Sequence, residues 1–184
     1  MESPIGLDVV RERLVRRQRK RIRSVRHQGQ VLLLAMCTAI ALISSELPIE
    51  MAERLSGRLH SREGREEFQF HWWQNPTLLP VRWGGSLKLL PWGSKSRRGP
   101  LPYGGWISEE HVSSVLSAPD EVVVPANLGF QAGTWFLILE GIKGVVVETK
   151  DGPRVYMLTT RSTNYYRNMT EQSPNMPALV NQTI

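Results

Sequence analysis

The chain has 184 residues, enough for one globular domain and a terminal appendage. Its formal net charge is +6, and residues 1–30 account for the whole excess, with nine Lys or Arg against three acids. The one cysteine, Cys37, excludes an intrachain disulfide, so ordinary packing must hold the domain together.

The N-terminal segment, residues 1–30, is predicted to be a basic cytoplasmic tail. An uncharged apolar run, residues 31–45, follows it directly. A basic flank before an apolar run is typical of membrane targeting, and the positive-inside rule then places the N-terminus in the cytoplasm. Seven basic residues are expected to contact lipid headgroups: Arg16, Arg17, Arg19, Lys20, Arg21, Arg23 and Arg26.

The apolar run predicts a transmembrane helix or uncleaved signal anchor over residues 31–49. Its length of about 15 residues, or about 19 if it reaches Ile49, falls between a signal-peptide core and a full span. A cleaved signal and a buried core helix in a soluble protein are the alternatives. Both membrane hypotheses place the rest of the chain outside the cytoplasm, in a periplasmic, extracellular or lumenal space.

Residues 50–70 are predicted to form a juxtamembrane helix or linker, because Leu47, Met51, Leu55 and Leu59 fall four apart along one helical stripe. A small β-rich domain is expected over residues 71–174. It opens with a stretch rich in Trp, Pro and Gly, in which the density of helix breakers excludes regular helix. Leu78-Leu79-Pro80 recurs as Leu89-Leu90-Pro91, which paired short strands or turns would explain.

Five tryptophans in this stretch are candidate partner-binding residues, because tryptophan is enriched at protein interfaces and at membrane boundaries: Trp72, Trp73, Trp83, Trp92 and Trp106. The alternative is that several of the rings form the core of the domain. A small basic cluster, Lys95, Arg97 and Arg98, follows in a Gly/Pro loop, where it either contacts phosphate or headgroups or is simply solvated.

The later part of the chain predicts short helices over residues 108–116 and 163–171, and strands over residues 122–124, 134–139, 145–150 and 154–159. Asp151-Gly152 lies between the last two strands, which is the strongest short sequence pattern for an antiparallel hairpin. Residues 175–184 look like a flexible tail. The predicted fold class is therefore α+β, with one N-terminal membrane helix before a mainly antiparallel β domain.

No established catalytic motif is present, and the histidines lack the spacing of metal ligands. We therefore assign no catalytic, cofactor-binding or metal-binding residues and expect no cofactor. Ser86 with Lys88, and Ser94 with Lys95, give the weak pattern of a Ser/Lys dyad.

Several short motifs occur in an order that loosely resembles the SOS-response-associated peptidase family. They are Arg82-Trp83-Gly84, Val124-Pro125-Ala126, Gly129-Phe130, Trp135, Thr159-Thr160 and Met176-Pro177. That family couples to abasic DNA through a cysteine directly after the initiator methionine. Here position 2 is Glu2 and the only cysteine is Cys37, so no site residue is transferred from the resemblance.

The sequence thus favours a non-catalytic, single-pass accessory or scaffolding subunit of a membrane-associated complex, with the lipid bilayer and protein partners as its ligands. One alternative is an exported enzyme with an unrecognised site. A second alternative is a soluble nucleic-acid-binding protein with a basic N-terminal arm, although nucleic acid is the less favoured partner.

Overall fold

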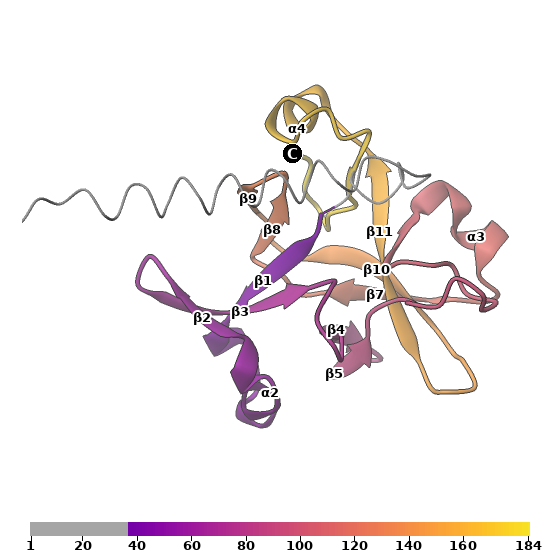
Figure 1. Cartoon of the computed structure of the whole chain (residues 1–184), viewed down its shortest axis with the longest axis horizontal. Coiled ribbons are helices and arrows are strands. Elements are labelled where there is room, and N and C mark those ends of the chain that lie inside the picture. Colours follow the sequence, from indigo (N-terminus) through magenta and orange to yellow (C-terminus); the bar gives the residue numbers. More distant parts are fainter. Residues whose placement is uncertain (1–36) are drawn as a thin grey trace, which may run out of the picture. The chain divides into compact units, whose positions relative to one another are not determined.

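The computed structural model describes residues 37–184 (Figure 1). This part of the chain is mostly β, with two sheets. The five-stranded sheet has the order β2-β3-β1-β8-β9. Its strands are β1 (Ala39–Ile43), β2 (Leu59–Arg62), β3 (Arg65–His71), β8 (Leu128–Gln131) and β9 (Thr134–Leu137).

The seven-stranded sheet has the order β12-β11-β10-β7-β4-β5, and β6 pairs in parallel with β11. Its strands are β4 (Leu78–Trp83), β5 (Ser86–Pro91), β6 (Trp106–Ser108), β7 (Asp120–Val124), β10 (Ile142–Val147), β11 (Arg154–Arg161) and β12 (Asn175–Pro177). The α-helices are short: α2 (Ile49–Arg54), α3 (Val112–Val115) and α4 (Asn164–Met169). Three 3₁₀ turns complete the elements: η1 (Ser44–Glu46), η2 (Ser56–Arg58) and η3 (Glu109–His111).

The main core combines buried side chains from both sheets, among them Ile40, Phe70, Val81 and Met157. A second cluster, with Val145, Val147 and Tyr156, contains the alternate residues of β10 and β11. Both faces of β10 are therefore buried, which explains why its sequence is a continuous Val-Val-Val run rather than an alternating pattern.

The transmembrane or signal-anchor prediction for residues 31–49 is wrong. Ala39–Ile43 is strand β1, which lies between β3 and β8 and is buried on both faces (Figure 1). Within residues 37–184 no helix is long and apolar enough to cross a membrane. A strand buried on both faces is as uncharged as a membrane helix, so apolar content alone could not separate the two. Residues 31–36, and the basic residues predicted to contact headgroups, lie outside the described part.

The α+β prediction is also wrong, and the segment of residues 50–70 shows why. The leucine stripe predicts one helix, but the chain forms α2 and then turns at Glu63-Gly64 into the β2–β3 hairpin. Both turn residues have positive φ, 51° and 78°, which suits a tight hairpin turn. The exposed and charged strand β2 has no apolar alternation, so its pattern resembles a solvated helix.

Two pairings expected from the sequence are confirmed. The Leu-Leu-Pro copies lie on β4 and β5, where Leu79 faces Leu90 across the antiparallel pair. Strands β10 and β11 form the hairpin that Asp151-Gly152 predicts. The C-terminal residues differ from the expected flexible tail, because β12 pairs with β11 and buries Met176.

Candidate functional site

The structure separates the five candidate tryptophans. Trp92 is only 1% exposed and packs edge-on against Trp72 and Trp106, with ring centroids 5.2 and 6.1 Å away. Trp83 lies apart and donates its ring N–H to Asp120 at 3.1 Å. Trp73 is 64% exposed and stacks on His71. Trp92 is therefore a core residue, and the partly buried Trp72 and Trp106 pack against it. Partner binding by the five tryptophans stays a prediction.

The two candidate Ser/Lys dyads are not assembled as pairs. The Ser86 hydroxyl donates to the carbonyl of Trp83 at 3.2 Å, and the Lys95 ammonium donates to the carbonyl of Gln74 at 2.5 Å. Among the described residues, no group of three or more His, Cys, Asp or Glu is placed to hold a metal ion.

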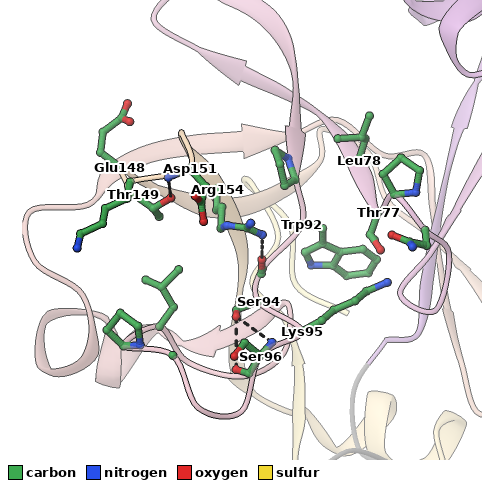
Figure 2. Close-up of a pocket in the computed structure, with 18 residues that line it drawn as sticks. Thr77, Leu78, Trp92, Ser94, Lys95, Ser96, Glu148, Thr149, Asp151 and Arg154 are labelled. Carbon is green, nitrogen blue, oxygen red and sulfur yellow. Dashed lines mark hydrogen bonds between the residues drawn. The ribbon is translucent and has the colours of Figure 1, made fainter.

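A cavity of about 990 Å³ lies between two loops of the seven-stranded sheet (Figure 2). One wall is the basic loop, residues 93–101, which follows β5; Lys95 lines the cavity, and Arg97 and Arg98 are not among the lining residues. The other wall is the hairpin turn, residues 148–154, between β10 and β11. A third side is formed by residues 75–78, which lead into β4, and Trp92 also lines the cavity. The volume is at the upper end of the range of about 300–1,000 Å³ found for ligand pockets.

The basic loop is fixed at its base by glycines. Ser94 and Gly104 exchange backbone hydrogen bonds of 2.9 and 2.8 Å, which close the loop. Gly93 has φ of +54°, and a Cβ there would lie 2.0 Å from the Gly104 carbonyl oxygen. Gly105 accepts the ring N–H of Trp92 at 2.8 Å. Only glycine permits these close approaches, so the loop leaves the core at a defined position.

The hairpin turn is joined to the basic loop through Arg154. Its Nη1 donates to the Gly93 carbonyl at 3.1 Å, as Figure 2 shows. Thr149 shapes the turn, because its hydroxyl donates to Gly152 O at 2.6 Å and accepts from Asp151 N at 3.2 Å. Both walls of the cavity therefore have their backbones fixed before any ligand arrives.

The two walls differ in charge, because the basic loop carries no acid whereas the hairpin turn carries acidic and basic residues in equal number. The basic loop holds Lys95, Arg97 and Arg98 and no acid, and all three are exposed. Arg97 lies over the Tyr103 ring at 4.9 Å, a cation–π contact that leaves its N–H groups free. On the hairpin turn Glu148 and Asp151 are exposed, and within residues 37–184 their carboxylates have no hydrogen-bond or ion-pair partner.

Cys37 lies in the main core and is not among the residues that line the cavity. Its thiol donates to Ala39 O at 2.9 Å, and burial raises its pKa to about 12. The thiol is therefore protonated at neutral pH and is a poor nucleophile. The segment that resembles the SOS-response-associated peptidase family passes beside it, because Thr38 N donates to Phe130 O at 2.9 Å.

Sequence reasoning found one wall of this site and missed the other. The cluster Lys95, Arg97 and Arg98 is visible as a local charge pattern, but Arg154 and Asp151 join it only through a pairing of distant strands. The Asp-Gly turn indicated the hairpin and gave no information on what the turn faces.

Three comparisons with known proteins add no identification: no family model, no curated protein and no solved structure matches this chain. The function must therefore be argued from the geometry.

Proposed function

We propose that the domain of residues 37–184 binds a single nucleic-acid strand, without covalent chemistry, in the cavity between the basic loop and the hairpin turn. The observation that supports this most directly is that Lys95 lines a large cavity whose other wall presents Arg154, while Arg97 and Arg98 are exposed on the same loop next to the lining residues.

The charge of the loop suits a phosphate backbone. Three cations within four residues match the closely spaced negative charges of a strand, and release of counterions then drives binding. The described residues, with this loop included, have 14 basic and 14 acidic side chains, so the positive patch is local and not a property of the whole surface. Arg97 and Arg98 are exposed, so their guanidinium groups can reach phosphates without losing internal ion pairs.

The remaining lining suits unstacked bases. Beside the polar groups, the cavity is lined by Pro76, Leu78, Pro91, Pro100 and Leu101. Apolar and flat surfaces bind the faces of exposed bases, which a single strand offers and a duplex keeps inside its stack. A single strand is therefore the nucleic acid that this geometry favours.

One sequence feature agrees with this ligand class. Residues 1–30 contain nine Lys or Arg, which were first predicted to contact lipid headgroups beside a membrane helix. Because residues 39–49 do not form that helix, we propose instead that these basic residues contact nucleic-acid phosphates. The loose resemblance to the SOS-response-associated peptidase family adds no support, because no family model matches this chain. The buried state of Cys37 gives no support for covalent coupling. The accessory role in a protein complex and an extracytoplasmic location stay predictions.

The test is a fluorescence-anisotropy titration of the full chain with a labelled single strand of about 15 deoxycytidines, over a series of salt concentrations. The test variant replaces Lys95, Arg97 and Arg98 by Ala. The matched control replaces Arg54, Arg65 and Arg161, which are exposed and form no ion pair within residues 37–184. Both variants lose three positive charges.

We expect the test variant to bind at least about tenfold more weakly at the lowest salt. Its slope of log K against log salt should fall by about 2, because each phosphate contact on a single strand contributes about 0.7. The control should keep most of the affinity and slope. Equal losses in the two variants would mean that net charge alone drives binding, and would refute the assignment of the cavity.

A further inference from the structure

Trp73 is the tryptophan whose ring lies mostly in solvent. It is 64% exposed, whereas the other five tryptophans of the chain are buried or half-buried. Its ring nevertheless has a defined position, because it stacks on the imidazole of His71 with ring centroids 4.3 Å apart and the planes 33° from parallel. Trp73 therefore adds little to the core and presents a fixed aromatic surface to solvent.

The support beneath this ring is held by hydrogen bonds. The His71 Nε2 atom lies 3.3 Å from Gln69 Oε1, and Gln69 Nε2 donates to the buried Glu67 at 2.8 Å. The turn that carries Trp73 is closed twice, because His71 N donates to Gln74 Oε1 and Gln74 N donates to His71 O, both at 3.1 Å. A ligand that stacks on Trp73 would therefore meet a ring that is already ordered, which lowers the entropic cost of binding.

Trp73 also belongs to a surface that continues into the cavity. Asn75, which lines the cavity, follows two residues later, so the two Cα atoms are at most about 7 Å apart. Lys95 joins the basic loop to this turn, because its ammonium donates to Gln74 O at 2.5 Å and lies 5.6 Å from the centre of the Trp72 ring. Figure 2 shows the Lys95 side chain beside the Trp92 ring, directed to the side of the cavity where Thr77 lies.

We propose that Trp73 stacks on a base of the bound strand, next to the nucleotides held in the cavity. The inference rests on the proposed function and adds the residue that binds a base outside the cavity. Sites for single strands combine cations along the backbone with aromatic side chains that stack on successive bases. A duplex keeps its base faces inside the stack, so Trp73 should contribute to binding of single strands alone.

The experiment is a fluorescence-anisotropy titration of the full chain with a labelled strand of about 15 deoxycytidines, at several salt concentrations. Trp73→Ala should bind about 5- to 100-fold more weakly, the range measured when a stacking side chain is removed. The slope of log K against log salt should not change, because stacking releases no counterions. Trp73→Phe, which keeps an aromatic face, should recover most of the loss, and Trp73→Leu, which keeps only apolar bulk, should not.

The matched control is Tyr165→Ala. Tyr165 is an aromatic residue of α4 that is 66% exposed and does not line the cavity, so its removal should leave the Kd within about twofold of the wild-type value. A duplex of the same length supplies the second control, and we expect Trp73→Ala to bind it as the wild-type chain does.

The outcomes separate the stacking role from the proposed function. If Trp73→Ala binds the strand as tightly as the wild type while the variant of Lys95, Arg97 and Arg98 loses affinity, stacking is refuted and the proposed function survives. If Trp73→Ala lowers the salt slope, or weakens duplex binding equally, the ring acts through the shape of the basic loop, and stacking is refuted as well. If the wild-type chain binds no single strand, both proposals are refuted together.

Discussion

Replacement of Leu42 by Ala gives the sharpest test of the fold in the segment that looks like a membrane helix. Leu42 is 0% exposed in β1, faces Phe68 across the strand pair and belongs to the main core. Truncation of a fully buried leucine leaves a cavity and costs about 2–5 kcal/mol of unfolding free energy. For a domain of about 150 residues, this corresponds to a fall in Tm of about 5–15 °C.

Ile49 provides the matched control. It lies in the same apolar stretch, at the start of α2, but is 76% exposed. Ile49→Ala should change the free energy of unfolding by no more than about 0.5 kcal/mol. In a membrane helix, both residues would face lipid or a neighbouring helix and no such contrast would be expected.

The assay is urea unfolding of the full chain, followed by tryptophan fluorescence. Leu42→Ala should shift the midpoint to lower urea with an unchanged m-value, which identifies a loss of stability and not a change in the unfolded state. Equal midpoints for the Leu42 and Ile49 variants would refute the placement of β1 in the core.

Two further predictions concern the core and the base of the cavity. Gly105→Ala would place its Cβ 2.1 Å from the Trp92 ring nitrogen and should destabilise the domain by about 1–3 kcal/mol in the same urea assay, whereas Gly57→Ala, with nothing within 4 Å, should be nearly neutral. The pKa of Cys37 is raised from 9.0 to about 12, so the folded state keeps a proton that the unfolded chain loses. Stability should therefore fall as pH rises from about 9 to 12, by up to about 1.4 kcal/mol per pH unit, and Cys37→Ala should flatten this dependence; identical pH profiles would contradict the burial of the thiol.

Local sequence patterns correctly predicted the strand pairings that join segments close together in the chain. The Asp151-Gly152 hairpin and the pairing of the two Leu-Leu-Pro copies each depend on a turn between adjacent strands. The apolar run could not be assigned in the same way. Its identity as β1 depends on pairing with β8, nearly ninety residues later, and such a strand has the same composition as a buried helix.

The candidate site shows the same contrast between local patterns, which the sequence reveals, and long-range contacts, which it does not. The cations of the basic loop are a local pattern, but the cavity exists because β10 and β11 bring the hairpin turn against that loop. The five tryptophans were predicted to form a partner-binding surface, partly because a small domain could not easily bury so many of them. Trp92 instead packs inside, between Trp72 and Trp106, where the rings position the loop that follows.

The most direct test of strand binding in the cavity is hydrogen–deuterium exchange of the full chain, with and without a saturating strand of about 15 deoxycytidines. We predict slower exchange in both residues 93–101 and residues 148–154, because a bound strand must contact the two walls together. Protection confined to residues 1–30, with no change on either wall, would contradict the account and leave the arm as the only binding segment.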